Sequence, residues 1–278
     1  MSAQIQSATS QPIIHFVHGN SFPSETYRAF FEYLRPQYDV QYLPMVGHNP
    51  VYPVTDGWKH LTQELIDTLI ARYTQPVILV GHSLGGILSL MAARARPDLV
   101  RCVVVLDSPI VAGWRAMLLR IFKTLGLDKK FSPARFSEKR RNRWADAEAA
   151  YQHFASKEMF AIWPPEVLRD YIRAGIKPDG DGVTLTFSRE IETAIYQTLP
   201  HNLGRLVRRP PAVPVGFVGG TESIECSQAG MSATRKIMGN HFKLIQGGHL
   251  IPMEVPAQTA AAVLDMIQSF NLPPVSNS

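Results

Sequence analysis

Hydrophobic positions along the first third of the chain, and again along its last quarter, group into two kinds of segment. Short, nearly continuous apolar runs are typical of strands buried on both faces, as in a parallel sheet covered by helices. Between them, apolar residues recur every three or four positions, as in amphipathic helices. The predicted strands cover 12–17, 40–43, 76–80, 100–106, 214–218 and 242–245, and the predicted helices cover 25–35, 56–73, 83–96, 228–238 and 255–270. This order predicts an α/β fold with a mostly parallel sheet.

The alternation stops in the middle of the chain, where the pattern is mainly helical apart from a strand-like run at 183–187. We therefore expect a core formed by residues 1–109 and 206–278, and an inserted helical cap formed by residues 110–205. Within the cap, 112–127 has an apolar stripe flanked by basic residues. We expect this stretch to pack on the core as a helix, with a mobile lid or a membrane-touching helix as the alternatives.

Composition narrows the class of protein. Of 278 residues, 45% are hydrophobic and 18% are charged, which suits a globular domain rather than a disordered chain. Two cysteines cannot form a disulfide framework, and no apolar stretch approaches the ~18 residues of a membrane span. The first residues have neither a basic region nor an apolar stretch, so we expect no secretory signal and a cytoplasmic location.

The net charge of +5 is concentrated in the predicted cap. Residues 111–205 hold sixteen basic and eleven acidic side chains, including the run Lys139-Arg140-Arg141-Asn142-Arg143. A solvated helix face is the simplest explanation, and a surface for an anionic substrate or lipid headgroups is the alternative. No nucleic-acid-binding motif accompanies the run, so a nucleic-acid partner is not expected.

A nucleophile is predicted where the third strand meets the following helix. The sequence Gly81-His82-Ser83-Leu84-Gly85 fits G-x-S-x-G, and it lies between an apolar strand and a helix, as the motif requires. The serine must stand on a sharp turn so that its hydroxyl is exposed, and larger side chains two positions away would collide with that turn. Ser83 is therefore the candidate nucleophile.

Two further loops complete the candidate chemistry. His-Gly-Asn, ending at Asn20, follows the first strand, and its loop is placed to supply a backbone N–H to an oxyanion hole. The N–H of Leu84, directly after the nucleophile, is the expected second donor. His249 lies on a Gly-rich loop after the last strand, from which it can reach Ser83 and act as general base. Two carboxylates could orient this histidine, because Asp107 ends one strand and Glu222 follows another.

Residues 12–109 and 213–270 resemble the α/β-hydrolase superfamily. The resemblance rests on H-G-N at 18–20, G-H-S-L-G-G at 81–86 and G-G-H-L-I-P at 247–252, in this order. It implies an α/β-hydrolase fold with helices on both faces of the sheet and an inserted cap. It also implies a Ser-His-acid triad without a metal or an organic cofactor.

The resemblance leaves the acid open. Family members usually place it in G-x-x-D after a late strand, and one way of counting puts Ser223 at that position, whereas another gives Glu222. One branch of the haloalkane dehalogenases takes the acid from the end of the preceding strand, where Asp107 stands. We favour Asp107 over Glu222.

A serine nucleophile forms an acyl-enzyme, so we expect a small, apolar carboxylic ester, thioester or lactone as substrate. Epoxide hydrolases and dehalogenases of the superfamily use an aspartate at this position and are disfavoured. The alternatives are a carbon–carbon bond hydrolase, a cofactor-free perhydrolase, or a receptor-like member that binds a ligand with little turnover. Five aromatic residues of the cap are candidates for the substrate pocket: Trp114, Phe122, Trp144, Phe160 and Trp163.

Overall fold

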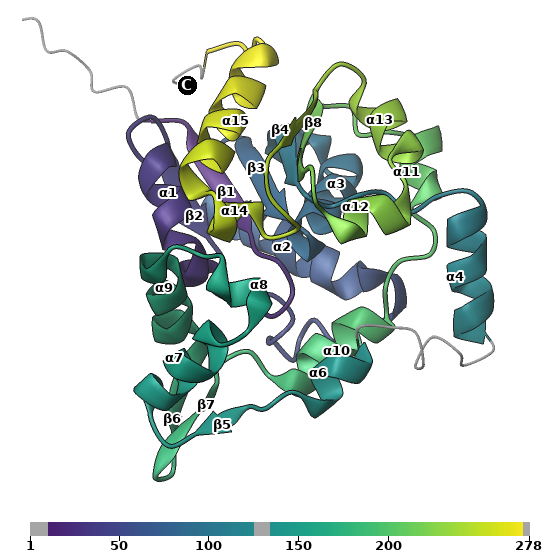
Figure 1. Ribbon diagram of the computed structural model, residues 1–278. Helices are drawn as coiled ribbons and strands as arrows, with labels where there is room; N and C mark the ends of the chain where they lie inside the picture. Colours follow the sequence, from purple (N-terminus) through teal and green to yellow (C-terminus); the bar gives the residue numbers. More distant parts are fainter. Residues whose placement is uncertain (1–10, 125–133, 275–278) are drawn as a thin grey trace, which may run out of the picture.

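A six-stranded sheet forms the centre of the protein (Figure 1). The computed structural model describes residues 11–124 and 134–274 of the chain. From one edge to the other, the strands are β2 (Asp39–Tyr42), β1 (Ile13–Val17), β3 (Val77–His82), β4 (Val100–Leu106), β8 (Val215–Gly220) and β9 (Phe242–Ile245). All neighbouring strands run parallel. The predicted parallel sheet is confirmed, and every strand overlaps its predicted run.

Helices cover both faces of this sheet, because alternate residues of each strand point to opposite sides. Val80 belongs to a hydrophobic cluster with the helices of one face, and its neighbour Leu79 belongs to a second cluster with the helices of the other. The first face carries α1 (Arg28–Leu34), α14 (Ile251–Glu254) and α15 (Pro256–Ser269). The second face carries α2 (Lys59–Arg72), α3 (Leu84–Ala95) and α13 (Ser232–Met238).

Helix boundaries differ from the predicted ones mainly near glycine and at short turns. The helix predicted at 228–238 is two helices, α12 (Ile224–Ala229) and α13, because Gly230 between them has a φ of +71°. Three 3-10 turns flank longer helices or strands: η1 (Ser24–Tyr27), η2 (Asp56–Trp58) and η3 (Pro97–Leu99).

The segment between β4 and β8, called the insert below, contains more β-structure than the sequence predicted. The helices of its described residues are α4 (Trp114–Thr124), α6 (Ala134–Lys139), α7 (Ala147–Ala155), α8 (Glu158–Ala161), α9 (Pro165–Gly175), α10 (Arg189–Gln197) and α11 (Gly204–Arg208). A small antiparallel sheet has the order β5 (Arg143–Trp144), β7 (Gly182–Leu185) and β6 (Ile176–Asp179). Gly180, with a φ of +59°, starts the two-residue turn of its hairpin. The strand-like run predicted at 183–187 overlaps β7, whereas its partner strands β5 and β6 were not predicted.

The described side chains of helix α4 are mostly exposed, which differs from the expected helix packed on the core. Trp114 and Met117 are 66% and 65% exposed, and Ala116 is the one buried residue among the side chains described in this helix. In Figure 1, α4 stands at the side of the molecule, on the side of α11 and α12. No helix in the described part of the chain is long and apolar enough to cross a membrane.

The rest of the insert shares a hydrophobic core with the sheet domain. Phe22, which follows β1, lies 5.9 Å from Trp163 and 5.6 Å from Tyr171 of the insert, measured between ring centroids. One cluster of buried side chains runs from the strands and α1 through these rings. Arg28 of α1 also pairs with Asp170 of α9 at 2.9 Å. The insert is thus fastened to the core by both apolar and charged contacts.

Candidate active site

Ser83 stands on a tight turn between β3 and α3. Its backbone has a φ of 52° and a ψ of −115°, a conformation that non-glycine residues rarely adopt. Gly81 and Gly85 make the turn possible: a Cβ on Gly81 would collide with the Gly85 carbonyl, and one on Gly85 would collide with the Val17 carbonyl. The glycines of the motif are therefore dictated by backbone contacts on both sides of the serine.

His249 reaches Ser83 from the loop between β9 and α14. Its Nε2 atom lies 3.0 Å from the Ser83 Oγ atom, within hydrogen-bond distance. The carboxylate of Glu254, at the end of α14, accepts hydrogen bonds from the N–H groups of Gly248 and Leu250 at 2.5 and 3.0 Å. These two bonds flank His249 and fix the loop that carries it.

Asp107 lies behind His249, directly after β4. Its Oδ1 atom is 2.7 Å from His249 Nδ1, and the Ser223 hydroxyl donates to the same oxygen at 2.6 Å. The N–H of Gly220 donates to Oδ2 at 2.7 Å. Burial alone would raise the pKa of Asp107, but these three hydrogen bonds outweigh it and hold the pKa below its ordinary value. The buried carboxylate is therefore charged.

The second acid candidate, Glu222, lies on the cavity wall. Glu222 is exposed, and its backbone N–H donates to the Gly247 carbonyl at 2.9 Å. Among the described residues, the ion pairs of His249 are with Asp107 and Glu225. Ser223, which one way of counting places at the position of the usual family acid, donates a hydrogen bond to Asp107. The geometry thus brings Asp107 to His249 and leaves Glu222 apart.

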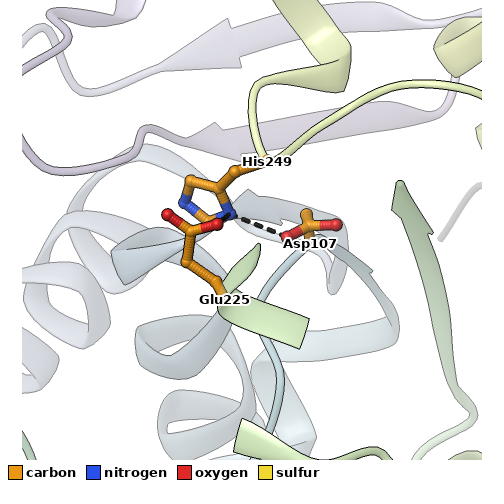
Figure 2. A group of neighbouring side chains, drawn as sticks. All are labelled: Asp107, Glu225 and His249. Carbon is orange, nitrogen blue, oxygen red and sulfur yellow. Dashed lines mark hydrogen bonds and ion pairs between the residues drawn. The ribbon is translucent and has the colours of Figure 1, made fainter. Parts of the chain in front are cut away.

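Figure 2 shows a further carboxylate beside His249, which the sequence analysis missed. Glu225 Oε2 lies 3.7 Å from His249 Nδ1, and its side chain is 48% exposed. Burial lowers the pKa of His249, but Asp107 and Glu225 raise it more, so the net shift is upward. The Nδ1, Asp107 and Glu225 ligand atoms lie within 4.8 Å of one another and could hold a metal ion. A cation there would have to replace the proton on Nδ1, and the absence of a metal stays a prediction.

A chain of hydrogen bonds links three loops beneath the site. His82 Nε2 lies 3.0 Å from the His249 carbonyl, which can only accept, so Nε2 carries the proton and Nδ1 accepts from the Tyr27 hydroxyl at 2.7 Å. Tyr27 in turn accepts from the N–H of Gly19 at 2.9 Å. Burial lowers the pKa of His82 to about 3, which keeps the ring neutral. The sequence offered one signal for these hydrogen bonds, namely that His82 directly precedes the serine of the G-x-S-x-G motif.

The two expected oxyanion donors lie at the same end of the sheet. Leu84 is the first residue of α3, so its N–H belongs to the group that a helix leaves without an intrahelical acceptor. Asn20 follows β1 and lines the cavity, and its side-chain Nδ2 donates to the Glu192 carbonyl of the insert at 3.1 Å. Their role as oxyanion donors stays a prediction.

A cavity of about 580 Å³ lies over Ser83, between the core and the insert. Phe160 lines it, as predicted, but Trp144 and Trp163 do not. They are buried inside the insert, where Trp144 packs on Phe154 and Trp163 on Phe160. Trp114 is exposed on α4, and the side chain of Phe122 lies outside the described residues. Phe154 and Met159 of the insert also line the cavity, and the apolar lining that was not predicted includes Phe22, Ile162, Ile224 and Leu250.

Comparisons with known proteins agree with this architecture. The model of the Alpha/beta hydrolase family matches residues 16–262. Lipase LipV of Mycobacterium tuberculosis is 25% identical over 209 residues, which cover 68% of this chain and 67% of the lipase. A solved E-2-(acetamidomethylene)succinate hydrolase has a TM-score of 0.75 at 22% identity and covers 93% of this chain and 92% of its own. An esterase of M. tuberculosis has a TM-score of 0.69 at 17% identity, with 94% and 86% covered. The chain belongs to the alpha/beta hydrolase family and has its fold, with an insert between β4 and β8.

Proposed function

We propose that the protein is a serine hydrolase that cleaves carboxylic esters through an acyl-enzyme. One observation carries the proposal: an unbroken line of hydrogen bonds runs from Ser83 Oγ through both ring nitrogens of His249 to the buried, charged Asp107. A hydroxyl, a neutral imidazole and an orienting carboxylate in this arrangement activate the hydroxyl as a nucleophile.

In the proposed reaction, His249 Nε2 takes the Ser83 proton as Oγ attacks the ester carbonyl. Charge develops on the carbonyl oxygen, which the N–H groups of Asn20 and Leu84 would stabilise. The imidazolium, held by Asp107, then protonates the leaving alcohol, and the acyl group stays on Ser83. Water, activated by the same Nε2, attacks the acyl-enzyme and releases the acid.

Support for an ester over other acyl compounds comes from the cavity and from the relatives. The apolar side chains around Ser83 suit the carbon chain of an ester, and similar proteins include a lipase and an esterase. The same line of hydrogen bonds would serve a thioester or lactone. It favours turnover over the receptor-like alternative, and carbon–carbon cleavage and perhydrolysis remain rival reactions for the same serine.

Labelling and turnover together test the proposal. A fluorophosphonate probe should modify Ser83, identified by mass spectrometry of the digested protein, and p-nitrophenyl esters of increasing chain length should be hydrolysed. Ser83→Ala should abolish both while the melting temperature stays close to that of the wild type. Ester turnover by Ser83→Ala, or a probe bound at another residue, would contradict the assignment.

A further inference from the structure

The cavity wall formed by the insert is positively charged. Arg140, Arg141, His153 and Lys157 all line it, on α7 and on the loops that flank α6 and α7. These residues lie in the part of the sequence that carries the whole net charge of +5. Three of the sixteen lysine and arginine side chains in this part of the sequence therefore border the space above Ser83.

One member of this group is neutralised and fixed. The Arg140 guanidinium donates to both Glu192 oxygens at 2.8 and 3.0 Å and to the Tyr171 hydroxyl at 3.0 Å. Arg141 and Lys157 differ, because neither takes part in an ion pair with the carboxylates of the described residues. Two uncompensated cations therefore border the cavity.

His153 indicates that these charges act together. Burial lowers its pKa, and the positive charges of Lys157, Arg141 and Arg140 lower it further. Arg141 is held in place on the same wall, because its guanidinium lies 5.8 Å from the centre of the Trp144 ring and its Nε donates to the Arg143 carbonyl at 2.9 Å. An anion placed here would relieve the repulsion among these groups.

The opposite wall carries the opposite charge. Glu222 and Glu225, around the start of α12, line the cavity and are exposed. Glu225 is also the residue 3.7 Å from His249 Nδ1. One side of the cavity is therefore negatively charged and the other positively charged. An anionic group is repelled from the α12 side and attracted to the insert.

We propose that the substrate is an anionic ester or thioester, whose carboxylate or phosphate binds Arg141 and Lys157 while its reacting carbonyl lies at Ser83. The reacting bond in this statement rests on the function proposed above, whereas the anion site rests on the charges of the wall. An anion bridging two cations makes charge-assisted hydrogen bonds, which are the strong ones among polar contacts.

Matched pairs of substrates separate the effect of charge from that of size. The mono-p-nitrophenyl ester of glutaric acid carries a carboxylate, and p-nitrophenyl hexanoate is a neutral counterpart of similar length. Hexanoyl-4′-phosphopantetheine carries a phosphate, and hexanoyl-pantetheine is its neutral counterpart. A preference within the first pair identifies a carboxylate as the bound anion, and a preference within the second identifies a phosphate.

The variant Arg141→Gln/Lys157→Gln removes both free charges from the wall. We expect kcat/KM for the preferred anionic substrate to fall about tenfold or more, and kcat/KM for its neutral counterpart to change less than about twofold. Arg169→Gln/Lys177→Gln is the matched control, since these residues lie in the insert, are exposed and do not line the cavity. High salt should weaken the anion preference of the wild type and leave the double variant unaffected.

Binding to Ser83→Ala, measured by calorimetry, distinguishes the two possible failures. Anion-dependent binding without turnover by the wild type would refute the proposed reaction and support the anion site. Turnover with equal kcat/KM for charged and neutral members of both pairs, unchanged in the double variant, would support the reaction and refute the anion site.

Discussion

Replacing Asp107 by asparagine should trap His249 in the wrong tautomer. The site offers the new amide one fixed donor, the Gly220 N–H, which must face the amide oxygen. The amide NH₂ then occupies the Oδ1 position, where it donates to Ser223 and to His249 Nδ1. With Nδ1 accepting, the ring proton moves to Nε2, which can no longer take the proton of Ser83.

The size of the effect follows from this exchange of donor and acceptor. Loss of the orienting carboxylate at such a site lowers kcat about 10⁴-fold. At 1.36 kcal/mol for each factor of ten, this raises the barrier by about 5.5 kcal/mol. In the variant, the Gly220 N–H and His249 Nδ1 keep partners, and the Ser223 hydroxyl loses the acceptor that Oδ1 provides, so the melting temperature should fall moderately while the fold is retained.

Steady-state hydrolysis of a p-nitrophenyl ester and the rate of fluorophosphonate labelling measure the change. Glu222→Gln is the matched control, an acid-to-amide change at the rival candidate, which lines the cavity after β8, and it should keep kcat within about twofold. The reasoning is refuted if Asp107→Asn retains a tenth or more of the wild-type kcat, or if Glu222→Gln loses activity to a similar extent as Asp107→Asn.

Three further predictions concern the surroundings of the site. Glu225→Gln should shift the acid limb of the kcat/KM–pH profile to lower pH. His249 must be neutral to act as base, and its pKa is raised above 6.5. Loss of the nearby negative charge lowers that pKa. An unmoved acid limb would contradict this. Tyr27→Phe leaves the Gly19 N–H and His82 Nδ1 without partners. Urea unfolding should therefore show that the free energy of unfolding falls by about 2 kcal/mol, and kcat should fall as well. An unchanged unfolding midpoint would rule out a role for these hydrogen bonds. Gly85→Ala drives a Cβ into the Val17 carbonyl and should cost about 3 kcal/mol in the same assay; a loss below 1 kcal/mol would show that the turn can relax.

The strands of the core and the positions of Ser83 and His249 could be predicted because each is marked by a short stretch of sequence. A strand buried on both faces is an apolar run, and the glycines around Ser83 are required by backbone contacts within the turn and with β1. The acid was harder, since Asp107 and Glu222 both follow strands of one sheet. Which carboxylate turns toward His249 depends on the φ of 40° at Asp107 and on the path of the loop after β8, and neither is encoded in a pattern.

The insert was predicted less well, because its aromatic residues have two possible surroundings. Trp144, Trp163 and Phe160 are all large aromatic residues, yet of the three only Phe160 borders the cavity, while the tryptophans are buried inside the insert. Spacing along the chain does not distinguish these positions. Glu225 was missed for a similar reason, since a surface glutamate on a short helix has no signature until the loop of His249 is folded beside it.

The hydrophobic core that the insert shares with the sheet has a consequence for heating and for engineering. Phe22 of the sheet domain packs against both Trp163 and Tyr171 of the insert. Unfolding of either part would therefore expose buried aromatic rings of the other. A calorimetric scan should therefore record one cooperative transition rather than two. An insert transplanted from a relative would need these contacts rebuilt, so new specificities are more readily sought by changing residues on the cavity wall than by exchanging the whole segment.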